Sequence, residues 1–177
     1  MPPTAVRLLL PPGTAGIRKT LQVMQQLTQQ GLRDPVIREH TMRVVQNVRH
    51  KDWDGELMGV HAWVRDHIRY VKDPVDTLEG GRVNGIEYLS TPRAVLRTAS
   101  GDCDDQAVLL ASMLGAIGHP SRFVAVAMNG KNFSHVFVES PTKRKTWLAA
   151  ETTEPVKLGW TPTNVTKRLV VSAVSGA

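Results

Sequence analysis

The most constraining feature of this chain is a nearly uninterrupted apolar run, Ala107–Leu114, that directly follows the segment Gly-Asp-Cys-Asp-Asp-Gln at 101–106. A helix that is apolar on every face must be buried. The glycine and acids before the run predict a turn and the first turn of that helix. Cys103, the only cysteine, is therefore predicted at the start of a buried helix. There, unpaired backbone N–H groups and the helix dipole favour thiolate over thiol.

Two further residues complete a set that could activate a thiol. His135 lies in a predicted strand, and Glu151 ends the next one. The order thiol, imidazole, carboxylate supplies a nucleophile, a base and a group that orients the base. The alternatives are an inert, packed cysteine and a histidine that is merely hydrogen-bonded on a strand face. His61 and His67 lie in an amphipathic helical stretch, where a place at the solvent edge is expected.

Four segments in this order resemble the transglutaminase-like superfamily, over about residues 57–153. Members share a papain-like fold and include cross-linking enzymes, proteases, amidases and variants without catalysis, so the resemblance implies acyl chemistry on an amide. The segments are Tyr-Leu-Ser-Thr-Pro-Arg-Ala-Val-Leu at 88–96, Gly-Asp-Cys-Asp-Asp at 101–105, Leu-Gly-Ala-Ile-Gly-His-Pro-Ser-Arg-Phe-Val at 114–124 and His-Val-Phe-Val-Glu at 135–139.

The resemblance implies a role for each residue of the set. Cys103 would be the nucleophile, His135 the general base, and Glu151 would stand where the family usually has aspartate at the start of an Asp-Pro-Thr-like segment. Because glutamate carries one more methylene, the strand or the side chain must retract for it to reach the imidazole. Glu154 is the alternative third member, and a degraded, non-catalytic site is the alternative to all three.

The acids that flank the cysteine have two interpretations. Asp102, Asp104 and Asp105 are typical of helix capping and of acid placement in a first helical turn. The resemblance also extends to periplasmic calcium-dependent cysteine proteases, in which such acids bind calcium, so Asp102 and Asp104 are candidate calcium ligands. No other cofactor is expected, and zinc is disfavoured by one cysteine without a histidine pair at ligand spacing.

The expected function is thiol-dependent acyl transfer on a protein or peptide substrate, with hydrolysis favoured over transglutaminase-type cross-linking. The backbone N–H of Cys103 is the expected first donor of an oxyanion hole. The alternative is a non-catalytic component of a phage virion or its assembly that retains the fold, because the layout also resembles short proteins of tailed phages and prophages.

Composition narrows the class of protein further. The 177 residues carry a formal charge of +6, but the basic residues are scattered and aromatics are few, which disfavours nucleic-acid binding. No apolar stretch approaches the roughly 20 residues of a spanning helix, and no signal peptide is seen. We expect a soluble, cytoplasmic protein, or one incorporated into a virion, with one domain over 1–177: a helical N-terminal extension, 1–52, and a catalytic-type core, 53–177.

Local patterns predict an α+β fold in which N-terminal helices precede a nucleophile helix packed on an antiparallel sheet. Apolar spacing predicts helices over about 17–31, from Asp34-Pro35 to Val48, and over 57–68, with a short helix after Thr91. Residues 70–90 are expected to be irregular. Turn signals there are Asp73-Pro74, Gly80-Gly81 and Asn84-Gly85. Strands are predicted at 123–128, 136–139, 146–150 and 169–174.

Overall fold

The computed structural model describes residues 4–72, 77–78, 81–82 and 86–174. Its helices are α1 (Thr14–Gly31), α2 (Pro35–Val44), α3 (Trp53–His67), α4 (Pro92–Thr98) and α5 (Cys103–Ala116). Its strands are β1 (Ala5–Leu9), β2 (Arg69–Tyr70), β3 (Thr77–Leu78), β4 (Gly81–Arg82), β5 (Ile86–Ser90), β6 (Ser100–Gly101), β7 (Arg122–Met128), β8 (His135–Pro141), β9 (Trp147–Ala150) and β10 (Val165–Ser172). The α+β class predicted from the sequence is confirmed.

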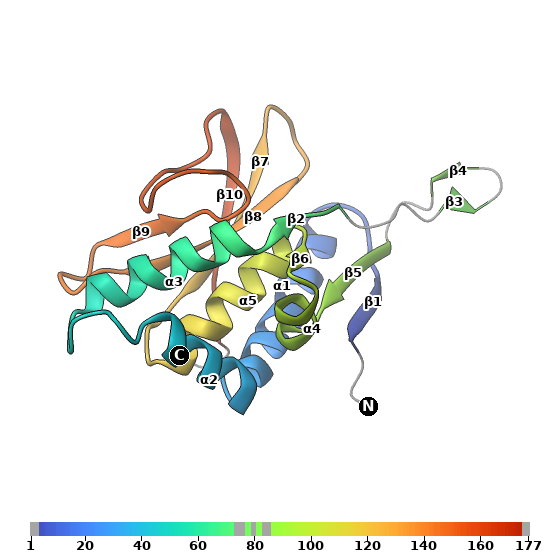
Figure 1. Cartoon of the computed structure of the whole chain (residues 1–177). Helices are drawn as coiled ribbons and strands as arrows, with labels where there is room; N and C mark the ends of the chain where they lie inside the picture. The colour runs from blue at the N-terminus through green and yellow to red at the C-terminus, as the bar shows by residue number, and fades with distance from the viewer. Residues whose placement is uncertain (1–3, 73–76, 79–80, 83–85, 175–177) are drawn as a thin grey trace.

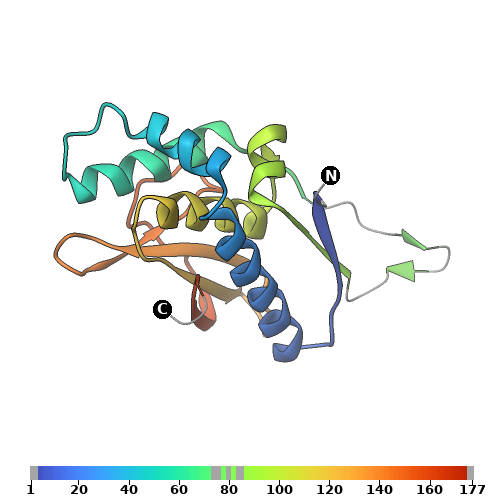
Figure 2. The same ribbon diagram turned by 90° about the horizontal axis from the view of Figure 1, so that it is seen from below.

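Helix α5 lies at the centre of the fold, between the other helices and the main sheet (Figures 1 and 2). Every residue from Asp104 to Leu114 is buried, and the apolar sequence predicts this for Ala107–Leu114. Burial of each large apolar side chain contributes about 1.5–3 kcal/mol, so this one helix supplies much of the stability of the core. The side chains that pack around it in one cluster include Leu21 and Met24 of α1, Ile37 of α2, Leu57 of α3, and Phe123 and Val138 of the sheet.

The main sheet is antiparallel, in the order β10-β7-β8-β9. Phe123 and Val138 pack in the core cluster with α5, whereas Val124 and Phe137, which are paired across β7 and β8, belong to a second apolar cluster. Because both faces bury apolar side chains, β7 reads as a continuous apolar run instead of an alternating one. The four predicted strands are all present. The Lys143–Lys145 turn forms the tip of the β8–β9 hairpin, with Lys145 at a φ of 64°.

Three sequence expectations need correction or fall outside the described residues. Residues 70–90 were expected to be irregular, but β5 pairs antiparallel with β1, with Val6 opposite Leu89. The pair forms because it buries Leu89 fully and Leu8 almost fully. Helix α2 ends at Val44, not Val48, because the chain enters turns at Val45. The predicted turns at Asp73-Pro74, Gly80-Gly81 and Asn84-Gly85 lie wholly or partly outside the described residues.

In the described part of the chain, no helix has the length and apolarity needed to cross a membrane.

A close contact of α1 with α4 and α5 depends on Gly31. A Cβ atom built there would lie 2.4 Å from Ser112 Oγ and 2.7 Å from Pro92 Cγ. We therefore expect Gly31→Ala to lower the free energy of unfolding by about 1–3 kcal/mol, measured by urea denaturation, because overpacking forces α1, α4 and α5 apart.

Gly59 in α3 provides the matched control for this substitution. A Cβ at Gly59 would have Val48 Cγ2 as its neighbour, at 3.6 Å, which is an ordinary contact. Gly59→Ala should raise the free energy of unfolding by about 0.5–1 kcal/mol through helix propensity alone. A Gly31→Ala protein as stable as the unsubstituted chain would contradict the close packing of α1 against α5.

Candidate active site

Cys103 is the first residue of α5 and is half-buried. Asp102 caps the helix, with its side chain accepting a hydrogen bond from the Asp105 N–H. The Asp105 carboxylate in turn accepts a bond of 2.6 Å from the backbone N–H of Ser90, at the end of β5. A Cβ at Gly101 would lie 2.7 Å from Asp105 Cβ, so only glycine permits this approach of the chain to the helix. Contacts of Asp105 with Ser90 of β5 and with Gly101 of β6 thus fix the start of α5.

His135 stands at the start of β8 and lies between two groups. Its Nε2 is 2.5 Å from Glu151 Oε2, and its imidazole is also hydrogen-bonded to the side chain of Cys103. Since Nε2 is engaged by Glu151, Nδ1 is the ring nitrogen left for the thiol. The side chain of His135 is 13% exposed and that of Glu151 is 1% exposed. The structure therefore brings together the three residues named from the sequence.

The electrostatics of this group favour an ion pair. Burial lowers the pKa of His135, but hydrogen bonds to Cys103 and Glu151 and the charges of both residues outweigh it, so the pKa rises from 6.5 to about 10. For Glu151, burial raises the pKa, but the hydrogen bond and charge of His135 and the two bonds from Thr153 lower it below its ordinary value. The imidazolium and the carboxylate are thus the stable forms over the neutral pH range.

The extra methylene of Glu151 is accommodated because Thr153, two residues later, bonds to the carboxylate and holds it back. Oε2 faces His135, while Oε1 accepts bonds from the N–H of Thr153 at 2.7 Å and its hydroxyl at 2.8 Å. These local bonds hold the carboxylate close to the end of β9, which is the retraction that the sequence required. Glu154, the alternative third member, is exposed, and it is Glu151 that contacts the imidazole.

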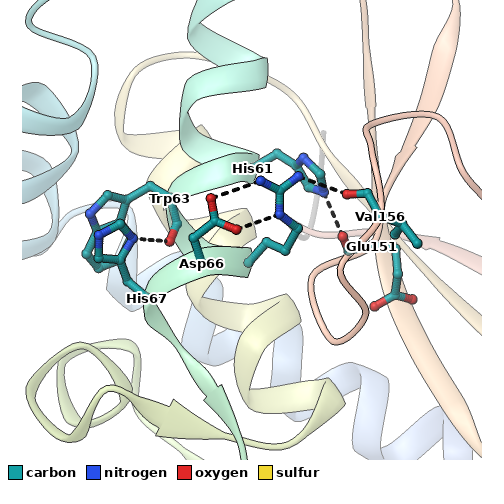
Figure 3. Close-up of polar contacts among 7 residues, drawn as sticks. His61, Trp63, Asp66, His67, Glu151 and Val156 are labelled. Carbon is teal, nitrogen blue, oxygen red and sulfur yellow. Dashed lines mark hydrogen bonds and ion pairs between the residues drawn. The ribbon is translucent and has the colours of Figure 1, made fainter.

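His61 of α3 was expected at the solvent edge, and this expectation is wrong. It is 1% exposed, and its Nε2 lies 2.6 Å from the backbone carbonyl oxygen of Glu151 (Figure 3). Burial lowers the pKa of His61, which favours a neutral ring with Nε2–H as the donor, because a carbonyl can only accept. Figure 3 shows the Glu151 side chain pointing away from His61. Helix α3 therefore holds the backbone of the residue whose carboxylate meets His135.

A second contact from α3 holds the same segment. Arg65 donates a bond of 2.9 Å to the carbonyl of Val156 while it pairs with Asp66 (Figure 3). His67, which is exposed as expected, bonds to the Trp63 carbonyl and stacks on the Trp63 ring at 4.8 Å. His61 and Arg65 therefore both bond α3 to the segment that follows β9.

The acids beside the thiol separate into two groups. Asp102 and Asp104 lie with Glu87 of β5, and the three residues offer carboxylate oxygens within 4.8 Å of one another. Burial, together with the hydrogen bond and charge of Asp102, raises the pKa of Asp104 well above its ordinary value. Asp105 instead bonds to the backbone of Ser90. Sequence analysis missed Glu87 because its strand was not predicted.

A cavity of 310 Å³ opens beside His135 and Glu151. Tyr70 and Trp160 line it, and each is about two-fifths exposed. Such partly exposed aromatic side chains offer flat apolar contact area beside His135 and Glu151.

The family model of the transglutaminase-like superfamily matches residues 41–152, which is more than half of the chain. The chain belongs to the transglutaminase-like superfamily. The matched region contains Cys103, His135 and Glu151 and ends one residue beyond the last of them. No curated protein matches the chain in sequence.

Several solved structures of bacterial proteins share the fold of this chain at low sequence identity. A Cytophaga hutchinsonii protein assigned as a cysteine protease is 12% identical, with a TM-score of 0.50 over 77% of this chain and 50% of that one. A Parabacteroides distasonis protein assigned as a protease is 15% identical, with a TM-score of 0.54 over 87% and 29%. Calcium-bound LapG of Legionella pneumophila is 19% identical, with a TM-score of 0.53 over 82% and 80%. The chain spans half or less of the first two proteins. These similarities establish the papain-like fold.

The ion pair between His135 and Glu151 gives stability a defined pH dependence. Because the folded pKa of His135 is raised, its contribution is full below about pH 6.5 and is lost as the pH rises toward 10. The lowered pKa of Glu151 adds a contribution that is lost as the pH falls below about 4.5. We expect Glu151→Gln to cost on the order of 3 kcal/mol near pH 6, and less as the pH approaches 10.

Glu154→Gln is the control for this pH series, since Glu154 is exposed three residues away. It should change the free energy of unfolding by less than about 0.5 kcal/mol at every pH. The measurement is denaturant unfolding of the three proteins at several pH values. A Glu151→Gln penalty that stays constant between pH 6 and 10 would show that the imidazolium does not supply the stability.

Proposed function

We propose that this protein is a thiol-dependent enzyme that cleaves amide bonds in peptides or proteins, with Cys103 as nucleophile, His135 as base and acid, and Glu151 as the group that orients His135. The observation that carries the proposal is the position of one imidazole between a thiol at a helix N-terminus and a buried carboxylate. A buried hydrogen-bonded network of this kind fixes the imidazole in the orientation that proton transfer to and from sulfur requires.

The proposed reaction proceeds in two halves. The Cys103 thiolate attacks the amide carbonyl, and the new C–S bond gives a tetrahedral oxyanion that the Cys103 backbone N–H can stabilise. Collapse breaks the C–N bond, and the leaving amine takes a proton from the His135 imidazolium. In the second half, His135 takes a proton from water, the hydroxide attacks the thioester, and the carboxylic acid leaves as the thiolate is restored. Glu151 stabilises the imidazolium throughout.

Hydrolysis is the preferred form of this chemistry. In transglutaminase-type cross-linking, a lysine amine would replace water in the second half, and a second protein must then be positioned against the thioester. The cavity beside His135, with Tyr70 and Trp160, is of a size for one peptide segment. The non-catalytic virion role rests on resemblance alone and stays a prediction.

The reactivity of Cys103 tests the proposal directly, since no other cysteine competes. Brief iodoacetamide treatment followed by intact-mass analysis should give fast labelling at pH 6, where an ordinary thiol with a pKa of about 8.5 is mostly protonated. We expect His135→Ala to slow labelling at pH 6 by about 100-fold, because the thiolate loses its cationic partner.

His67→Ala is the matched control, because it removes an exposed histidine of α3 and should leave the labelling rate unchanged. Circular dichroism of each variant confirms that it is folded. Labelling that follows an ordinary thiol titration and ignores His135 would reject the catalytic proposal and favour a structural role.

We further propose that Glu87, Asp102 and Asp104 bind a calcium ion. All three supply the hard oxygen ligands that calcium prefers, and their oxygens lie within 4.8 Å of one another, close enough to share one ion. The similarity to LapG, which was solved with calcium bound, supports this assignment. A bound calcium ion would neutralise the negative charge that these carboxylates gather beside Cys103.

Thermal unfolding with and without calcium tests this site. Millimolar CaCl2 should raise the melting temperature by several degrees. The same concentration of MgCl2 should raise it by less, because magnesium requires near-ideal octahedral geometry and gives up its bound water less readily. Asp104→Asn should abolish the calcium-dependent rise, whereas Asp66→Asn, which changes an acid paired with Arg65, should preserve it. An equal rise in the Asp104→Asn protein would place the effect elsewhere.

A further inference from the structure

A second and larger cavity, of 450 Å³, lies at the start of α1. We call it the α1 cavity. It is lined by the β1–α1 connection, the first two turns of α1, residues 131–133 before β8, Glu87 of β5 and Lys167 of β10. Phe133 in its wall is two residues from His135, and Glu87 also belongs to the acidic group beside Cys103. The α1 cavity therefore adjoins the candidate active site.

The charge at the α1 cavity is positive on balance. Lys131 and Lys167 line it, and among the described residues neither lysine has a carboxylate partner. Helix α1 begins there, with no acidic residue in its first turn and no side-chain cap on Gly13. The backbone N–H groups of a first helical turn have no partners within the helix, so they add partial positive charge. Glu87 is the one carboxylate in the lining.

Thr20 provides an independent sign that a polar ligand belongs in the α1 cavity. It lines the cavity and is 4% exposed, yet its hydroxyl has no hydrogen-bond partner. Thr28, further along α1, also lacks a partner but does not line the α1 cavity, whereas Thr41 of α2 and Ser112 of α5, which are as buried, both donate to the carbonyl four residues before them, at 2.7 Å. A buried hydroxyl without a partner is costly, and a ligand oxygen would remove that cost.

We propose that the α1 cavity binds a carboxylate on a short apolar stem, and that it is a subsite for an acidic side chain or the C-terminal carboxylate of the peptide substrate. The assignment of the α1 cavity to the peptide substrate rests on the proposed function. The lysines and the N-terminus of α1 supply the attraction for the carboxylate, and Thr20 offers it a hydroxyl donor. Leu10, Ile17 and Phe133 supply apolar contact for the stem.

Three dipeptides separate the two sources of the carboxylate. N-acetyl-Leu-Glu amide carries it on the side chain, N-acetyl-Leu-Gln carries it at the C-terminus, and N-acetyl-Leu-Gln amide carries none. In a titration followed by ¹⁵N–¹H NMR, we expect saturable shifts of the Thr14 and Ala15 amide signals with one or both acidic peptides and not with the neutral one. Absence of such shifts, or equal shifts with the neutral peptide, would overturn the proposal.

Two sets of variants locate the binding. Lys131→Gln combined with Lys167→Gln should weaken binding about 10-fold, whereas Lys143→Gln with Lys157→Gln, the same charge change outside the α1 cavity, should leave it unchanged. Thr20→Val should weaken binding several-fold and raise the melting temperature of the free protein, because it removes the unpartnered hydroxyl. Equal binding by all these variants and the unsubstituted protein would place the ligand elsewhere.

The NMR titration does not depend on catalysis and can be repeated with Cys103→Ala. Rapid alkylation of Cys103 together with no dipeptide binding would count against the α1 cavity alone. Binding together with an unreactive Cys103 would support the carboxylate site while rejecting the catalytic proposal.

Discussion

The burial of α5 on every side is the constraint on which the site depends. Its apolar residues fill the space between the other helices and the sheet, so the helix cannot shift along its axis without opening the core. Its first turn is held by the bond from Ser90 to Asp105 and by the Gln106 amide, which donates to the Gly101 carbonyl. Cys103, at the end of this rigid element, is therefore held in place although it is half-buried.

The partners of Cys103 come from parts of the chain that reach it independently. His135 arrives on β8, whose inner face packs against α5, and Glu151 arrives at the end of β9, the neighbour of β8 in the sheet. The bond from His61 to the Glu151 carbonyl adds α3 to the group. Because α3 also packs on α5, a shift of α3 would move the carboxylate relative to the thiol. Packing and the geometry of the candidate site are thus coupled in this fold.

The sequence predicted those features whose cause is local. The apolar run of α5 and the glycine and acids before it predicted where the thiol lies, and continuous apolar runs predicted β7 and β8. The sequence did not predict features that depend on residues far apart along the chain. The β1–β5 pair joins residues about eighty positions apart, so neither short strand is distinctive alone. His61 looked like any histidine of an amphipathic helix, because its partner is a backbone carbonyl, which no residue type reveals.

The segment between β7 and β8 contributes to both the α1 cavity and the cavity beside His135. Phe133 lines the α1 cavity, whereas the next two residues, Ser134 and His135, line the cavity that contains Trp160. The chain thus changes the cavity that it lines between Phe133 and Ser134, with the imidazole on the aromatic side and Phe133 on the cationic side. A peptide that lies across Cys103 and extends to both sides would meet aromatic rings at one end and lysines at the other. The direction in which a substrate binds would then follow from its own charge, with its acidic end toward α1.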